Sequence, residues 1–235
     1  MIKFYKKILG LSLILATFSI GPGCRQDYVP TDEELADYGW VMFSQGDYVG
    51  ARDWFQRSID KDSTYMDGFC GIGWSNGKLG YADTAYQYLY LGKDMTYDDI
   101  RFPNHVNLPI DIVAGLVFAS SAIGDDSLSI AYSQEFDFKQ NQIQVDLGDG
   151  DFRWTLKETL FTSLGYDSKI NAQDVRLVWS VAQYNSSQFI ECVSNIRLIW
   201  EDADISGVFD PDISTVQGRN EIAKELEKLQ LLLSS

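Results

Sequence analysis

Few side chains in this sequence are suited to chemistry, and they lack the partners that catalysis needs. His105 is the single histidine, and no carboxylate or serine motif accompanies it in its Pro-bounded loop. Three cysteines and one histidine supply too few ligands for an ordinary zinc site. The sequence also has no phosphate-binding loop, dinucleotide fingerprint or nucleophile elbow. We therefore expect a protein that is not an enzyme and has no cofactor or metal.

An aspartate cluster is the remaining candidate for chemistry. Asp146, Asp149 and Asp151 flank two glycines and could offer oxygen ligands to Ca²⁺. A complete calcium loop also needs a bidentate glutamate at fixed spacing, and this stretch has none. The alternative, which we take as the default, is a solvated turn of a β-hairpin.

The net charge excludes one class of partner. The 235 residues include 34 Asp and Glu against 19 Lys and Arg, which gives a net charge of −15 and a pI near 4.3. A chain without excess cations is poorly suited to neutralise phosphates, so nucleic acid is not an expected partner. The apolar fraction of 45% is that of a folded, globular protein.

The first 24 residues have the pattern of an export signal. Three lysines precede the 13-residue, mostly apolar stretch 8–20, and Gly21-Pro22-Gly23-Cys24 follows. This order resembles a bacterial lipoprotein signal, although Gly21 and Pro22 depart from its usual residues. The resemblance implies that Cys24 is acylated (as by palmitate), becomes the first mature residue and attaches the protein to a membrane. An ordinary signal peptide followed by a coincidental cysteine is the alternative.

The mature chain is then expected to be more acidic and to sit in the cell envelope. It has 212 residues and a net charge of −18, because the signal removes three lysines and no acids. Arg25 differs from the aspartate that would retain a lipoprotein in the inner membrane. The resemblance therefore implies the periplasmic face of the outer membrane.

A repeat of 34 residues organises the first half of the chain. Residues 35–58 and 69–92 match at one constant offset, and a fixed period is the signature of a repeat fold. The matched pairs are Gly39 with Gly73, Trp40 with Trp74, Gly46 with Gly80, Ala51 with Ala85, and Phe55 with Leu89.

These residues resemble the tetratricopeptide repeat (TPR), a pair of antiparallel helices. The resemblance implies a mainly α superhelix of about three to four helical hairpins, of which two are clear. Gly39 and Gly73 would let the two helices of a repeat approach closely, and Ala51 and Ala85 would pack on the next repeat. A capping box at Thr31 predicts where the first helix begins.

The later repeats are weaker, and one segment is not helical in pattern. Apolar residues alternate at 143–147 and at 152–156 around a Gly/Asp cluster, which predicts a small β-hairpin. Cys70 and Cys192 fall at apolar helical positions and are expected to pack as free, buried thiols. The chain divides into 1–23 (signal peptide), 24–30 (lipid anchor and tether), 31–95 (two repeats), 96–135 (loop and degenerate helical pair), 136–165 (β insertion) and 166–235 (degenerate repeat and capping helix).

Two tryptophans are the strongest candidates for binding a partner. Trp40 and Trp74 share one repeat position, which in tetratricopeptide folds lies on the concave groove, and large aromatic residues there serve as anchors. The polar rim would consist of Asp37, Ser44 and Lys78. The competing interpretation is that both tryptophans only fill the interior of the superhelix.

The sequence thus predicts a lipid-anchored, non-catalytic scaffold that binds a protein or peptide in the bacterial cell envelope. The alternative is a ligand-binding accessory lipoprotein of an outer-membrane transporter, whose known members are about twice as long. A sugar held by clustered aromatic residues would favour that alternative, and an extended peptide in the groove would favour the scaffold.

Overall fold

A computed structural model describes residues 28–98, 107–166 and 169–233. The chain divides into two units, residues 1–30 and 31–235, and the description below concerns the second. The predicted signal, Cys24 and His105 lie outside the described residues. Within the described part of the chain, no helix is long and apolar enough to cross a membrane.

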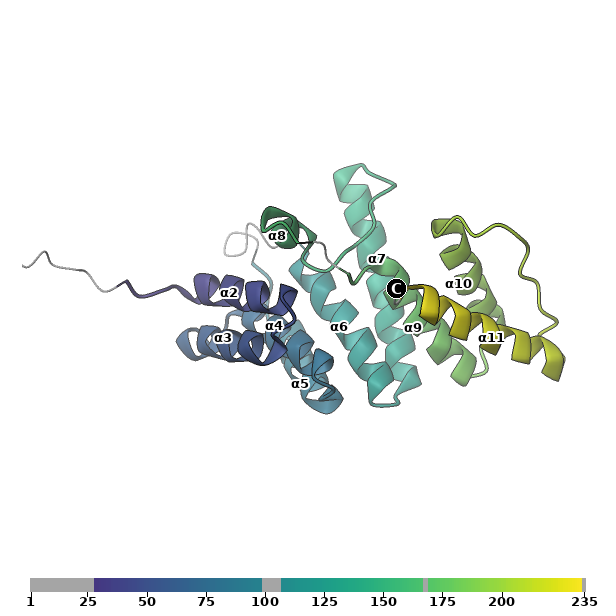
Figure 1. Ribbon diagram of the computed structural model, residues 1–235, viewed down its shortest axis with the longest axis horizontal. Coiled ribbons are helices and arrows are strands. Elements are labelled where there is room, and N and C mark those ends of the chain that lie inside the picture. The colour runs from purple at the N-terminus through teal and green to yellow at the C-terminus, as the bar shows by residue number, and fades with distance from the viewer. Residues whose placement is uncertain (1–27, 99–106, 167–168, 234–235) are drawn as a thin grey trace, which may run out of the picture. The chain divides into compact units, whose positions relative to one another are not determined.

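The second unit is mainly helical, as predicted. Its helices follow one another as hairpins, and each hairpin packs on the next (Figure 1). The four hairpins are α2 (Asp32–Ser44) with α3 (Tyr48–Lys61), α4 (Met66–Lys78) with α5 (Ala82–Lys93), α6 (Leu108–Ala122) with α7 (Asp126–Leu147), and α9 (Ala172–Asn185) with α10 (Phe189–Asp202).

The turns of the first two hairpins have the same backbone geometry. Gly46 and Gly80 both adopt a φ of 82°, a left-handed conformation that favours glycine, and both lie between the two helices of their repeat. The first helix begins at the predicted capping box, in which the Thr31 hydroxyl accepts from the Glu34 amide and the Glu34 carboxylate accepts from the Thr31 amide. The 34-residue period of the sequence is therefore repeated in the backbone.

Close approach of helices explains the repeated glycines inside them. A methyl group on Gly39 would lie 2.7 Å from the ring of Phe55, and one on Gly71 would overlap the same ring. Leu89 lies between Gly73 and Gly115 in the same manner. One large side chain per repeat is thus inserted between its own hairpin and the next, where only glycine leaves room.

The later hairpins use related turns. Gly124 turns the third hairpin with a φ of 80°, and Ser187 stands at the glycine position of the fourth with a φ of 60°. Asn171 and Asp174 form a capping box at the start of α9. Cys70 and Cys192 are buried, free thiols, as predicted.

The predicted β-hairpin is wrong. Residues 136–147 continue α7, whose buried Phe136 and Gln140 follow helical spacing, and Gly148 ends the helix in a left-handed conformation with a φ of 65°. Val145 is 74% exposed, so the alternating apolar pattern does not mark a buried strand face. The described residues contain one isolated β-bridge, between Thr155 and Asn171, and no strand.

The described residues of the unit contain two further helices. The short α8 (Glu158–Ser163) follows an extended segment after α7. α11 (Val216–Leu233) packs on α9 and α10 and buries one apolar stripe of three residues: Ile222, Leu226 and Leu229. It thereby covers the surface that the last hairpin would otherwise expose.

Candidate binding groove

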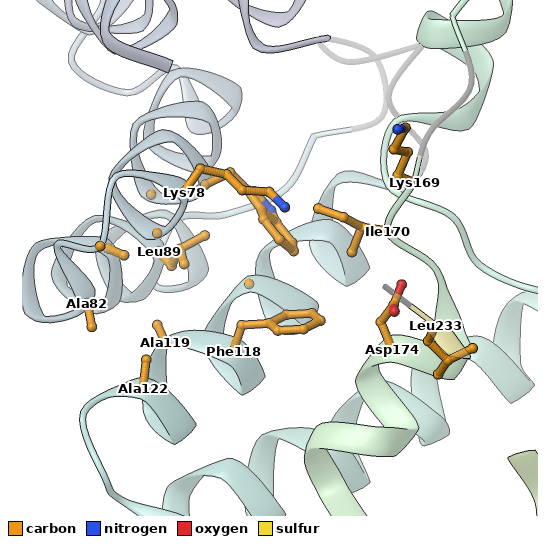
Figure 2. A pocket seen from close by; sticks show the side chains of 16 residues that line it. Lys78, Ala82, Leu89, Phe118, Ala119, Ala122, Lys169, Ile170, Asp174 and Leu233 are labelled. Carbon is orange, nitrogen blue, oxygen red and sulfur yellow. The ribbon is translucent and has the colours of Figure 1, made fainter. Parts of the chain in front are cut away.

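A groove of about 870 Å³ opens between the second and third hairpins and the start of α9 (Figure 2). α4, α5 and α6 form its floor, and the residues before and within the first turn of α9 form the opposite wall. Its lining consists of Gly73, Trp74, Gly77, Lys78, Gly80, Ala82, Ala85, Leu89, Gly115, Phe118, Ala119, Ala122, Lys169, Ile170, Asp174 and Leu233.

Small residues create the space. Half of the lining consists of glycine or alanine, contributed by three successive helices and the turn between two of them. At Gly77, for example, an added methyl group would meet only the Ala85 Cβ, at 3.9 Å. A helix surface without long side chains is a surface onto which another molecule can place its own.

Trp74 is the principal aromatic residue of the groove. Its ring packs against Phe118, with ring centroids 5.6 Å apart, and only 5% of the residue is exposed. The indole N–H donates to the backbone carbonyl of Asp111 at 3.1 Å. This bond satisfies the one polar atom of the indole, so the rest of the ring that lines the groove is apolar.

Charged groups lie at the rim rather than on the floor. Figure 2 shows Lys78 reaching across the opening from α4, with Lys169 and Asp174 on the far wall. Nearby protein lowers the pKa of Lys78 by removing water from its ammonium, and attraction to Asp174 acts in the opposite direction. Loss of water likewise raises the pKa of Asp174, against its hydrogen bond from the Asn171 amide and the charge of Lys78.

Trp40 does not lie in this groove, although its repeat position is that of Trp74. It is fully buried, and its indole N–H donates to Asp67 at 3.0 Å. Phe161 of α8 packs on its ring, and the Lys157 ammonium lies 5.0 Å from the ring centroid. The chain's own segment therefore covers the inner face of the first repeat, and Trp40 is a core residue.

The other predicted rim residues also lie outside the groove. Ser44 donates to the carbonyl of Val41 at 2.8 Å, which closes the last turn of α2. Asp37 is half-buried, and burial together with the charge of Asp67 raises its pKa to about 6. Of the five predicted binding residues, the groove thus contains Trp74 and Lys78.

Behind the groove lies a buried ion cluster that the sequence did not predict. The Lys157 ammonium lies 2.7 Å from Oδ1 of Asp67 and 3.6 Å from Oδ2 of Asp111, and all three side chains are buried. The Trp154 indole donates to Oδ1 of Asp111 at 2.8 Å. Asp67 and Asp111 come from α4 and α6, while Lys157 comes from the segment before α8.

The backbone of that segment explains how Lys157 reaches the cluster. The Trp154 amide donates to the side chain of Gln140 on α7, and its carbonyl accepts from Ala172 at the start of α9. Lys157 itself has a φ of 50°, which turns the chain from the extended segment into α8. A non-glycine residue in this conformation is held by its surroundings, here by two carboxylates.

Burial and the charges of the neighbouring groups set the electrostatics of the cluster. Burial raises the pKa of Asp111 to about 7, although the charge of Lys157 and the Trp154 hydrogen bond act to lower it. Burial alone would lower the pKa of Lys157, but Asp67 and Asp111 raise it above its ordinary value. Since the three groups are closed to solvent, their geometry suits a fixed structural role rather than chemistry on a substrate.

Metal binding finds no support in the part of the chain that the structure describes. No three histidine, cysteine, aspartate or glutamate side chains there are placed to share an ion. Asp149, at the predicted turn, accepts from the Asp151 amide at 2.9 Å, as in an ordinary Asx turn.

Comparison with known proteins adds little to this picture. No family model and no curated protein matches the chain. One similar solved structure is that of a thermophilic TPR protein from Thermus thermophilus, which is 13% identical. The match covers 83% of this chain and 99% of that one, with a TM-score of 0.38. The description of the fold as helical hairpins with a 34-residue period rests on the chain's own helices and glycines.

Proposed function

We propose that this protein is a non-catalytic, lipid-anchored scaffold that binds a protein segment in the groove between its second and third hairpins. The observation that supports this most directly is the groove itself, with a volume of about 870 Å³ and a lining that is mostly apolar. A concave, preformed and apolar surface with a few charges at its rim is typical of a binding site.

The composition of the groove favours a macromolecular partner over a small polar ligand. Its floor runs over three successive helices and presents few polar side chains that could fix a small molecule. An extended or helical segment could instead place several apolar side chains on this floor at once. Trp74 and Phe118 would then form part of the apolar wall against which these side chains pack.

The anchor at Cys24 is supported by the sequence pattern of residues 1–24. The mature surface, with a net charge of −18, repels anionic headgroups, so attachment through acyl chains fits this protein better than attachment through charge. Residues 28–30 have no regular secondary structure and lead directly into the capping box of α2. We place the protein at the periplasmic face of a bacterial outer membrane, consistent with Arg25 after the cysteine.

Site-specific photocrosslinking in the organism that encodes the protein tests the groove. A photoreactive phenylalanine would replace Ala122 or Lys169 in the lining, and exposed Lys224 on α11 as the control. We expect a covalent adduct with one defined protein from the groove positions but not from Lys224. The adduct at position 122 should disappear when Gly77→Leu fills the groove. Equal adducts at all three positions, or none in the groove, would exclude the proposed binding site.

Membrane attachment is tested separately. Wild-type protein should take up an alkyne analogue of palmitate and partition into the detergent phase. Cys24→Ser should abolish both, because the thiol is the acceptor of the lipid. If wild-type protein enters the detergent phase but takes up no alkyne label, the proposed lipid anchor is wrong and the groove proposal is unaffected.

A further inference from the structure

We infer that the groove selects a partner segment that carries bulky aliphatic side chains and a carboxylate placed to meet Lys78. This inference rests on the proposed function and names the chemistry of the partner. Two features of the groove lead to it: a floor of small residues, and a cation at the rim with no ion-pair partner among the described residues.

The floor requires large side chains from the occupant. Gly77, Ala82 and Ala119 leave depth that their own side chains do not fill, and Trp74 and Phe118 supply apolar walls. Burial of apolar surface is worth about 25 cal/mol per Å², so an aliphatic side chain fills such a space better than a polar one.

The protein itself shows which side chain suits the groove. Leu233, in the last turn of α11, lies in the lining at the edge of the opening, across from α4 (Figure 2). The preceding Leu231 and Leu232 are exposed and are not part of the lining. A leucine-type side chain is therefore already accommodated at one end, and the remaining volume offers space for more of the same kind.

The charges at the rim favour an anionic group on the occupant. No described residue lies within ion-pair distance of the Lys78 ammonium, and Lys169 adds a second cation on the far wall. Asp174 opposes them, but one of its oxygens already accepts the Asn171 amide in the capping box of α9. The rim thus has one excess positive charge on a chain that is otherwise strongly acidic.

Loss of water makes Lys78 the better of the two cations for recognition. The lowered pKa of its ammonium reflects protein that surrounds the group without pairing it, so a carboxylate in the groove would recover favourable interactions. The acidic remainder of the surface repels an acidic partner in general. A carboxylate placed at Lys78 would nevertheless be attracted, which makes the recognition specific for position.

Fluorescence anisotropy with defined peptides tests the inference. The probe is a labelled nonapeptide with leucine at four alternate positions, one central glutamate and serine elsewhere, and matched peptides carry glutamine or lysine in place of the glutamate. We expect the glutamate peptide to bind wild-type protein about three- to fivefold more tightly than the glutamine peptide, as for one partly exposed ion pair. The lysine peptide should bind most weakly.

Variants of the protein separate charge from groove shape. Lys78→Met keeps the apolar stem, and it should remove the difference between the glutamate and glutamine peptides. Lys224→Met, outside the groove, should leave that difference unchanged. Gly77→Leu should abolish binding of all peptides by filling the floor, while Gly77→Ala, whose methyl group fits, should keep it. Far-UV circular dichroism checks the fold of each variant.

The outcomes distinguish this inference from the proposed function. If all peptides bind equally to wild type and Lys78→Met, and Gly77→Leu abolishes their binding, the carboxylate preference is wrong and the groove is still a peptide site. If no peptide binds, the inference fails, and the crosslinking experiment decides separately whether a protein occupies the groove. If dodecanoate binds in a Lys78-dependent manner and no peptide binds, the inference of a peptide partner is overturned in favour of a lipid site.

Discussion

Lys157 donates a hydrogen bond of 2.7 Å to Asp67, a residue ninety positions earlier in the chain, and both side chains are buried. The same ammonium lies 3.6 Å from Asp111. One cation thus links the segment before α8 to α4 of the second hairpin and α6 of the third. Because these contacts cover Trp40 and leave Trp74 at the groove, the cluster decides which part of the inner surface remains open.

Removal of the cation should destabilise the fold strongly. Lys157→Met would remove the ammonium that contacts the buried carboxylates of Asp67 and Asp111, and loss of one partner of a buried ion pair costs about 3–5 kcal/mol. We expect the midpoint of urea unfolding, followed by tryptophan fluorescence, to fall accordingly. The matched control is Arg197→Met, which breaks the exposed pair with Asp210 and should cost less than about 1 kcal/mol. Similar losses in the two variants would show that the cluster is not a major source of stability.

Stability should increase as the pH falls from 8 to 5. The pKa of Asp111 is about 7 in the folded state against an ordinary value of 3.8, so the native protein binds more protons than the unfolded chain between these values. The free energy of unfolding should therefore rise by about 2 kcal/mol over this interval. Asp37, with a pKa of about 6, contributes with the same sign.

Asp111→Asn provides the control for this pH dependence. Asparagine resembles the protonated carboxyl group and can still accept the Trp154 hydrogen bond. The variant should show a flatter dependence of unfolding free energy on pH, measured by urea titrations at several pH values. A slope equal to that of wild type would assign the effect to other groups.

Two glycines of α4 should respond oppositely to alanine. Gly71→Ala would place a methyl group on the ring of Phe55, and overpacking of this kind costs about 1–3 kcal/mol. Gly77→Ala meets only Ala85 at 3.9 Å and should be neutral or stabilising by less than about 1 kcal/mol. Thermal unfolding of the two variants measures both changes in stability. A Gly71→Ala variant as stable as wild type would contradict the close packing of α3 on α4.

The turn of the fourth hairpin should improve with glycine. Ser187 has a φ of 60°, where the other three hairpins have glycine. Ser187→Gly should raise the free energy of unfolding by roughly 0.5–1 kcal/mol, because it removes the cost of a left-handed conformation at a residue with a side chain. Ser186→Gly, at a φ of −85°, is the control and should not stabilise the protein.

Local features of the sequence predicted much of the helical architecture. The 34-residue offset between Gly46 and Gly80 predicted two hairpins with equivalent turns. A left-handed backbone conformation favours glycine whatever the surrounding tertiary structure is. The capping box at Thr31 predicted the start of α2, since its two hydrogen bonds join residues three apart. The β-hairpin prediction failed where the pattern was ambiguous: three alternating apolar residues also fit the exposed end of a long helix.

The sequence alone determined the period, the turns and the chemical types of the candidate binding residues. It could not distinguish Trp40 from Trp74, since both follow the packing glycine at the same position of the repeat. Only the tertiary structure decided between them, because Lys157 and Phe161 arrive from a distant part of the chain to cover Trp40, while no segment with such contacts covers Trp74 in the described structure. Equivalent positions in a repeat have the same local geometry, but their exposure depends on which distant segment packs on them.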